Sequence, residues 1–470
     1  MESNILLFCV FALAVALIIY FIPQKFRLWG LLIANCAFYL LCSWQMSLIL
    51  LSVILLTYVG TRWIASSEGR KKIALALTIV PSLLLLFLAK YIGLISEFVI
   101  SLMNLIGVKN VSENGIEALS ILGLSYYVFK ATSYAIDVYR GKYEAETSFV
   151  KVFVYISFFA HIICGPISRY DVYRENLQDI GYHEESVVAG IRKIILGIFM
   201  KAVIADRLSL YVSNIYADYH SAPGLALWMA AIFYAIQLYC DFAGYSYVAI
   251  GFTNMLGIKC EVNFNKPYYS RTIKEFWNRW HISLSSWLRD YVYFTLGGNR
   301  CSKVRHFLNV MLTFLVSGIW HGAGLTFITW GLLHGLFVYL SPRALSKAGN
   351  KVLVFGSVLV TFFISVLLWI FFRSESVHDA CMFIWRMFTD IHFDMMSIQL
   401  SVLPFDNSNT CVAKLMVVLG FILTLGLKEW NDVFGVIRPK AWMRSTWYIF
   451  MISSIFLFGK FGAGFIYGNF

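Results

Sequence analysis

Charged residues are scarce in this sequence. Asp, Glu, Lys and Arg make up 14% of the 470 residues, against about 25% in an ordinary soluble domain. Hydrophobic residues make up 59%, against roughly 45–50%. This balance excludes an ordinary soluble protein and indicates a polytopic membrane protein.

Metal-ligand and disulfide patterns are also missing. The nine cysteines contain no CxxC pair, and the nine histidines show no HxxxH or HExxH spacing. Most cysteines have apolar neighbours and are expected to be buried thiols. The sequence therefore predicts no metal site and no disulfide framework.

A basic soluble domain is absent as well, although the net charge is +12. The densest basic segment, 266–305, has eight basic and two acidic residues and lies between apolar runs. We expect its charge to set membrane topology and to contact lipid headgroups, so no nucleic-acid binding is predicted.

Long apolar runs occur throughout the chain, and many approach the about 20 residues that cross a bilayer as a helix. They are 5–22, 28–41, 46–64, 73–88, 149–163, 225–239, 307–319, 327–340, 352–372, 412–427 and 447–458. We predict an all-α, multi-pass membrane protein with roughly 10–12 transmembrane helices, some short or re-entrant, plus short interfacial helices. The first run is expected to be a retained helix, because no polar mature domain follows it.

Charge placement predicts the orientation. Glu2 precedes the first run and Lys25 and Arg27 follow it, so the N-terminus is expected outside. Segment 266–305 is expected to face the cytoplasm because of its many basic residues.

Within that segment, residues 276–293 have the pattern of an interfacial amphipathic helix. Trp277, Trp280, Leu284, Trp287 and Tyr291 recur at steps of three and four, with Arg279, Ser283, Ser286 and Asp290 opposite. His281 falls toward the buried face. Taken alone, it is most simply a hydrogen-bonded packing histidine.

Residues 317–324 (SGIWHGAG) place an imidazole among small and apolar residues. Titratable groups at membrane depth are rare and indicate function, and His321 is the side chain type best suited to exchange a proton near neutral pH. The glycines around it are expected to leave room for a substrate beside the ring. A packing histidine at a helix end is the alternative.

Seven short segments together resemble the bacterial membrane-bound O-acyltransferases, in the branch that O-acetylates alginate and peptidoglycan. They are 164–170 (CGPISRY), 241–246 (DFAGYS), 263–268 (NFNKPY), 275–285 (EFWNRWHISLS), 287–291 (WLRDY), 296–300 (LGGNR) and 317–322 (SGIWHG). The resemblance is dense from about 150 to 340 and implies one membrane domain over 1–470 with a central tunnel. Within it, 1–145 would hold N-terminal helices, 146–342 the catalytic core and 343–470 the C-terminal helices and tail.

The resemblance also implies roles for particular residues. His321 would be the catalytic base, with His281 in support. Residues expected to bind substrate or line the tunnel are Trp320, Asn278, Asp241, Arg289, Asp290 and Ser317. For Asp241, which lies in an apolar run, a structural ion pair or helix cap and a direct role carry equal weight.

The last six residues, 465–470 (FIYGNF), resemble the ending of the polysaccharide acetylation transferases. The resemblance implies that Tyr467 carries the acyl group as a tyrosyl ester. Such an ester keeps much of the transfer potential of a thioester, because a phenol has a pKa of about 10. An aromatic anchor at the membrane interface is the alternative.

These features predict an O-acetyltransferase in the bacterial cytoplasmic membrane. It would take acetyl groups from acetyl-CoA, used as a substrate with no bound cofactor, and pass them across the bilayer. An extracytoplasmic SGNH or esterase-like partner would complete transfer to a polysaccharide, either an alginate-like exopolysaccharide or peptidoglycan. A transporter or flippase is the competing class, but the internal repeats common in transporters are not found.

Overall fold

The computed structural model describes residues 5–106, 123–162, 164–342, 345, 350–392, 411–438 and 440–461. Helices account for all regular structure in these residues, and no strand occurs in them. The predicted all-α fold is confirmed. Contacts between residues divide the described chain into two compact units. Unit 1 takes the residues before Ile191 together with Ala249–Glu261, and unit 2 takes Ile191–Val248 and the residues from Val262 onward.

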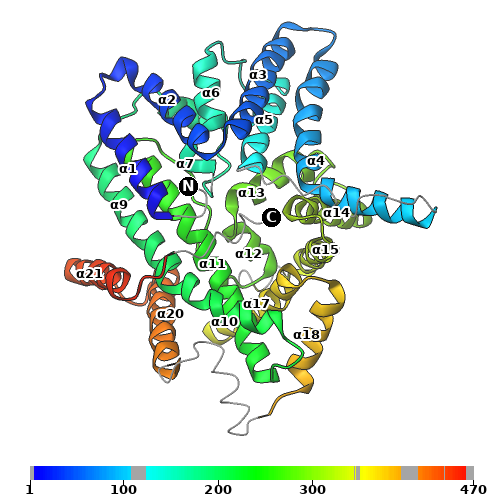
Figure 1. The fold of residues 1–470 in the computed structure, drawn as a ribbon, viewed down its shortest axis with the longest axis vertical. Helices are drawn as coiled ribbons and strands as arrows, with labels where there is room; N and C mark the ends of the chain where they lie inside the picture. Colours follow the sequence, from blue (N-terminus) through cyan, green and yellow to red (C-terminus); the bar gives the residue numbers. More distant parts are fainter. Residues whose placement is uncertain are drawn as a thin grey trace. The chain divides into compact units, whose positions relative to one another are not determined.

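Unit 1 is built mainly from the first eight helices (Figure 1). They are α1 (Ile5–Phe21), α2 (Gln24–Cys42), α3 (Trp44–Ser66), α4 (Lys71–Leu105), α5 (Leu124–Tyr139), α6 (Phe149–Ser157), α7 (Phe159–Ile162) and α8 (Tyr170–Asn176). Helix α3 packs against α4 and α5, and α2 packs against α3 and α6. Phe8, Phe38 and Phe159 join α1, α2 and α7, with ring centroids 5.8–6.4 Å apart. Helices α9 (Glu184–Ile198) and α11 (Gly224–Met255) contribute residues to both units.

Unit 2 holds the predicted site. Its remaining elements are η1 (Phe199–Ala205), α10 (Asp206–Ala217), η2 (Pro267–Tyr269), α12 (Ile273–Arg279), α13 (Ile282–Leu288), η3 (Arg289–Tyr293), α14 (Lys303–His321), α15 (Leu325–Leu340), α17 (Lys351–Arg373), α18 (Val377–Thr389), α20 (Cys411–Phe434) and α21 (Ala441–Phe458). Helices α14 and α15 form a tightly packed hairpin, and α17 packs against α15. Elements η1 and η3 are π-helical turns, which interrupt α-helices frequently at functional sites.

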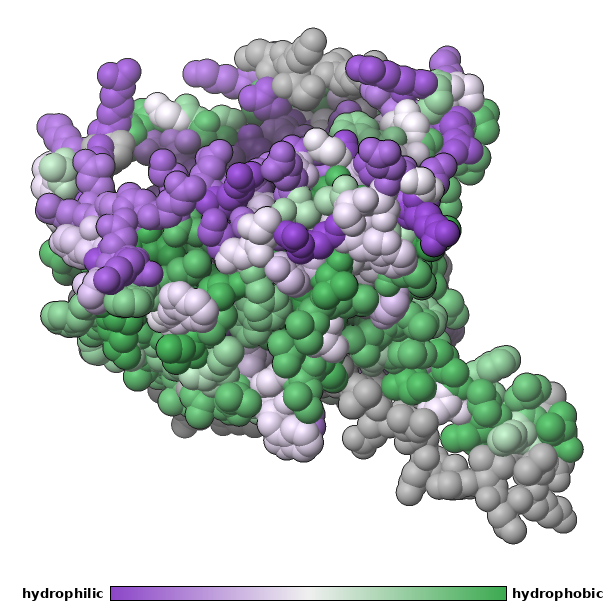
Figure 2. Space-filling model, turned by 90° about the horizontal axis from the view of Figure 1, so that it is seen from above, coloured by the Kyte–Doolittle hydropathy of each residue, from purple (hydrophilic) through white to green (hydrophobic). Residues whose placement is uncertain are grey.

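Five helices in the described residues are long and apolar enough to cross a membrane: α2, α3, α4, α11 and α17. Three shorter apolar helical segments, 5–21, 149–162 and 325–340, accompany them. Hydrophobic residues cover broad areas of the surface (Figure 2), and Phe21, for example, is 87% exposed. An apolar surface of this kind is stable against lipid rather than water. Fewer helices than the predicted 10–12 meet this criterion because several apolar helices are short or contain charges.

The single amphipathic helix predicted over 276–293 is wrong. The chain forms α12, then a break, then α13 and the π-helical turn η3. His281 lies in the break with φ of +42°, a left-handed conformation that is uncommon outside glycine. The predicted apolar face is nevertheless buried, since Trp277, Trp280, Leu284, Trp287 and Tyr291 are all at most 8% exposed.

Hydrogen bonds to a distant loop cause the break. The Ile282 N–H donates to the Asn263 carbonyl (2.9 Å), and the Asn265 N–H donates to the Arg279 carbonyl (2.9 Å). The Ser283 hydroxyl donates to the Asn263 side-chain oxygen (2.6 Å). These bonds replace the i to i−4 bonds of a continuous helix, and they bury Ser283 on the side predicted to face water.

Candidate functional site

His321 is the last residue of α14. The helix ends there because Gly322 adopts an extended conformation. The His321 side chain is 3% exposed. Three aromatic rings lie nearly perpendicular to its imidazole, with centroids at 4.8 Å for Trp320, 4.9 Å for Trp330 and 5.3 Å for Phe372. The hairpin of α14 and α15 and the C-terminal end of α17 thus hold the ring in one orientation.

The glycines near His321 pack helices together. A Cβ atom on Gly318 would lie 2.5 Å from the Phe327 carbonyl oxygen, and one on Gly322 would overlap the Phe327 ring. Gly331, across the hairpin, is equally close to the Phe314 carbonyl oxygen. The expectation that Gly318 and Gly322 leave space for a substrate is therefore wrong. Their small size instead allows α14 and α15 to approach closely.

His281 approaches the same cluster from the break between α12 and α13. It is 1% exposed, and its ring lies 4.7 Å from Phe242 and 6.0 Å from Trp320. Neither ring nitrogen has a hydrogen-bond partner among the described residues. Burial lowers the pKa of His281 to about 3, so the imidazole is neutral at physiological pH. A left-handed backbone and two unsatisfied buried nitrogens are costly, a combination typical of functional sites.

A third histidine, which the sequence analysis did not single out, completes the cluster. His334 on α15 is fully buried, and its Nδ1 accepts a hydrogen bond from Trp277 Nε1 at 3.1 Å. Its ring lies 4.9 Å from Trp330, which also contacts His321. His334, like His321, is a titratable residue within an apolar run, so the same sequence criterion predicts a functional role for both.

Ser317 lies one helical turn before His321 on α14, so the two side chains share a face. It is 1% exposed, and its hydroxyl has no hydrogen-bond partner within the described part of the chain. Trp320 contacts both His281 and His321. The structure therefore brings together four of the predicted site residues: His321, His281, Trp320 and Ser317.

Of three other predicted residues, two are exposed and the third, Asp290, is half-buried. Asn278 and Arg289 are exposed, and Arg289 Nε forms an ion pair with Asp290 Oδ1 at 3.1 Å. Their predicted contact with substrate stays a prediction. Tyr467 lies outside the described residues, so its role as an acyl carrier also stays a prediction.

Asp241 on α11 lies in a buried ionic cluster. Its Oδ1 is 2.6 Å from Lys201 Nζ in the π-helical turn η1, and the same ammonium lies 2.6 Å from Asp206 Oδ1. All three side chains are at most 3% exposed. A structural ion pair, one of the two roles the sequence left open, accounts for the burial of Asp241.

We expect Asp241→Asn to lower the amount of folded protein rather than turnover per folded molecule. Removing one partner from a buried ion pair typically costs about 3–5 kcal/mol. Thermal unfolding in detergent and activity per folded molecule would separate the two effects. Asp432→Asn is the matched control, because Asp432 pairs with Lys428 at 2.7 Å in a half-exposed position. Normal abundance with low turnover would instead give Asp241 a chemical role.

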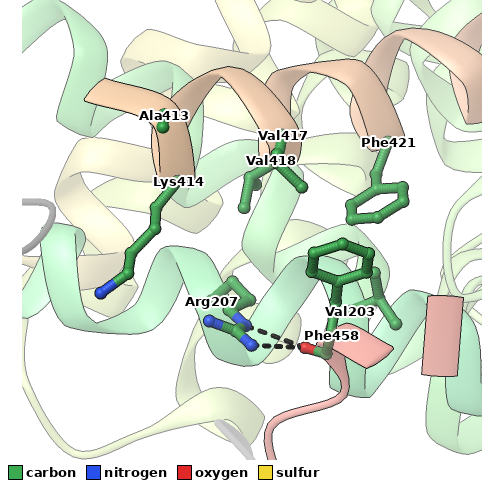
Figure 3. A pocket seen from close by; sticks show the side chains of 8 residues that line it. All are labelled: Val203, Arg207, Ala413, Lys414, Val417, Val418, Phe421 and Phe458. Atoms are coloured by element: carbon green, nitrogen blue, oxygen red, sulfur yellow. Dashed lines mark hydrogen bonds between the residues drawn. The ribbon is translucent and has the colours of Figure 1, made fainter. Parts of the chain in front are cut away.

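No group of three or more His, Cys, Asp or Glu side chains in the described residues could hold a metal ion. A pocket elsewhere in unit 2 is lined by no histidine (Figure 3). Its walls are mainly apolar, with Arg207 and Lys414 among the lining residues.

Among the described cysteines Cys164 and Cys240 are buried, while Cys301 and Cys381 are exposed. The expectation that most thiols are buried is therefore wrong.

The apolar helices and the buried histidine cluster are typical of a polytopic membrane enzyme that moves a proton at an imidazole. Residues 145–344 match the model of the MBOAT, membrane-bound O-acyltransferase, family. A probable alginate O-acetylase of Pseudomonas aeruginosa is 34% identical over 449 residues, which cover 94% of this chain and 84% of that protein. The peptidoglycan O-acetyltransferase of Helicobacter pylori is 30% identical, covering 80% of this chain and 78% of its own length. The teichoic acid D-alanyltransferase of Bacillus subtilis is 34% identical over 47% of this chain and 58% of its own.

This chain belongs to the membrane-bound O-acyltransferase family. It is therefore a membrane acyltransferase, and the predicted family and enzyme class are confirmed. The competing transporter interpretation has no support from these relatives.

Proposed function

We propose that this chain takes acetyl groups from acetyl-CoA in the cytoplasm and passes them across the bacterial cytoplasmic membrane for O-acetylation of an extracytoplasmic polysaccharide. The observation that carries the proposal is the buried cluster of His321, His281 and Trp320 at the end of α14. It holds a base away from water, where an acyl group can change carriers without hydrolysis.

His321 acts as the general base in this proposal. A hydroxyl oxygen attacks the carbonyl carbon of the acetyl thioester while an imidazole nitrogen of His321 takes its proton. The C–S bond then breaks, and the proton passes from the imidazolium to the departing thiolate. General base catalysis of this kind typically contributes about 10²–10⁴-fold. Because His321 is 3% exposed, both substrates must enter through the predicted tunnel to reach it.

The donor is proposed to arrive on the side of segment 266–305. Its many basic side chains, including exposed Lys274 and Arg300, attract the phosphates of CoA. The neutral side chains of His281 and Ser317 then orient the acetyl group beside His321.

Tyr467 is proposed to be the first acceptor. Two contacts of unit 2 fix the chain just before this tail. Arg207 donates from Nε (3.0 Å) and Nη2 (2.7 Å) to the Phe458 carbonyl (Figure 3). The Lys460 N–H donates to the Ala202 carbonyl (2.9 Å). A fixed starting point limits how far the phenol of Tyr467 can lie from this part of unit 2, which would raise its effective concentration there.

An SGNH or esterase-like protein outside the membrane is proposed to receive the acetyl group and deliver it to the polymer. The relative from Pseudomonas aeruginosa is named a probable alginate O-acetylase, and the one from Helicobacter pylori a peptidoglycan O-acetyltransferase. These names support a polysaccharide acceptor, either alginate-like or peptidoglycan.

Membrane vesicles of defined sidedness would test the proposed donor and direction. Inside-out vesicles expose the cytoplasmic face, so they are expected to release CoA from added radiolabelled acetyl-CoA and to retain the label. Right-side-out vesicles with the same amount of protein are expected to do neither. Equal release from both preparations, or none from inside-out vesicles that contain the chain and its acceptor system, would contradict the proposal.

A further inference from the structure

Unit 1 contains a cysteine and a histidine in hydrogen-bond contact. Cys260 Sγ lies 3.3 Å from His161 Nε2, although the two residues are 99 positions apart in the chain. His161 is on α7 and is 1% exposed, whereas Cys260 follows α11 and is half-buried. A thiol beside a buried imidazole is a common arrangement for a nucleophile and its base.

The His161 ring is held firmly. Phe158 meets it edge-on at 4.8 Å, and Tyr173 lies 6.3 Å away. Gly165 passes so close to the His161 backbone that any side chain there would overlap it. On the far side of the ring, Ser168 Oγ lies 3.4 Å from Nδ1. This geometry gives the imidazole a third group that fixes its orientation.

The surrounding hydrogen bonds allow Nε2 to act as the acceptor. Thr253 Oγ1 lies 3.2 Å from Nε2, but its hydroxyl can donate to the Ala249 carbonyl at 2.8 Å. The proton of a neutral His161 can then be assigned to Nδ1, where Ser168 Oγ accepts it. In this tautomer Nε2 can accept a hydrogen bond from the Cys260 thiol at 3.3 Å.

Other groups in the cluster favour negative charge. Lys130 is 1% exposed and lies over the rings of Tyr155 and Tyr173. Burial lowers its pKa to about 7, and attraction to a Cys260 thiolate opposes this shift, so the thiolate and the protonated lysine stabilise each other. The Tyr173 hydroxyl is buried and has no hydrogen-bond partner among the described residues. A cation and an unused donor both stabilise a thiolate and the oxyanion that forms when it attacks a carbonyl.

We propose that Cys260 is a nucleophilic thiol that accepts an acyl group from a cytoplasmic acyl thioester, with His161 as its base and Ser168 positioning the imidazole. Cys260 lies six residues before the basic segment that starts at Lys266, which is proposed to attract the donor. The choice of donor rests on the proposed function; the reactivity of the thiol does not.

The step is a thiol–thioester exchange, in which the acyl group moves from the sulfur of CoA to the sulfur of Cys260. His161 Nε2 takes the proton from Cys260 Sγ, and the sulfur attacks the carbonyl carbon of the donor thioester. The bond between that carbon and the sulfur of CoA breaks, and the proton passes from His161 to the CoA thiolate. The products are acyl-Cys260 and free CoA, so no oxidant or other reactant is required.

Alkylation by iodoacetamide tests the thiol without any acyl donor. Cys301 on segment 266–305 is exposed and serves as the reference thiol of the same protein. A free thiol with a pKa near 8.5 gains about twentyfold in reactive thiolate from pH 7 to pH 9. We expect the Cys260 rate to change by less than about threefold, and His161→Gln or Ser168→Ala to restore a steep rise at Cys260 alone. Parallel profiles for Cys260 and Cys301 in the natural protein would overturn the proposal.

Acetylation tests the acyl step. The purified full-length protein is incubated with acetyl-CoA, digested, and analysed by mass spectrometry for an acetyl group on the Cys260 peptide that neutral hydroxylamine removes. We expect this group in the natural protein and in His321→Ala, but not in Cys260→Ser or His161→Gln. Its absence while the acceptor is acetylated normally would overturn the inference and leave the proposed function intact. If instead Cys260 is acetylated but no acceptor becomes acetylated, the proposed function is wrong and the inference about the Cys260 thiol is supported.

Discussion

Replacing His321 with alanine or glutamine is expected to abolish acetyl transfer while leaving the protein in the membrane. The general base is lost in both variants, and its typical contribution is about 10²–10⁴-fold in rate. Glutamine keeps most of the side-chain volume among Trp320, Trp330 and Phe372, so its loss of activity could not be attributed to a cavity. The measurement is release of CoA from acetyl-CoA per molecule of folded protein.

His306→Ala is the matched control for His321. His306 lies on the same helix, α14, but is half-buried and contacts Tyr339 with rings 5.4 Å apart. It is expected to retain nearly all activity, since it lies outside the histidine cluster. Activity of His321→Gln equal to that of the natural protein would remove the base from the mechanism. Loss of folded protein in both His321 variants would show that the ring is mainly a packing group.

The local sequence was sufficient to find His321 but not to describe its surroundings. An imidazole in an apolar run is unusual wherever the helix lies, so its importance follows from composition alone. The role of Gly318 and Gly322 does not follow from the sequence, because a small residue next to a histidine can provide either space or close packing. The choice depends on Phe327, which comes from the next helix.

His281 shows why periodicity failed over 276–293. Its spacing fits a helix, but the bonds that Asn263 and Asn265 make to Ile282 and Arg279 break that helix. A helical period of 3.6 residues reports only on neighbouring positions, so it cannot predict hydrogen bonds to residues so far away in sequence. The same limit applies to Asp241, whose partner Lys201 lies 40 residues earlier in a π-helical turn. His334, by contrast, lies in an apolar run of its own, so composition alone marks it as an unusual titratable group.

Tyr467→Phe is expected to reduce acetylation of the polysaccharide to the level of cells that lack this chain. The substitution keeps the aromatic ring that would anchor the tail at the interface and removes only the hydroxyl that would carry the acetyl ester. Acetyl content of the exported polymer, measured after alkaline release, would report the effect. Tyr448→Phe on α21 is the matched control, because its ring contacts Arg192 through a face that needs no hydroxyl. Full acetylation by Tyr467→Phe would eliminate the carrier role.

The order of the two steps can be tested with the same residue. If His321 loads Tyr467, the C-terminal peptide should carry an acetyl group in the natural protein when the extracytoplasmic partner is absent, and none in His321→Gln. Arg207→Met should give an intermediate level, because it removes both hydrogen bonds to the Phe458 carbonyl and leaves the catalytic histidine untouched. Acetylation of Tyr467 in His321→Gln at the natural rate would mean that another group performs the first transfer. In that case His321 would act only after the acetyl group has reached the tail.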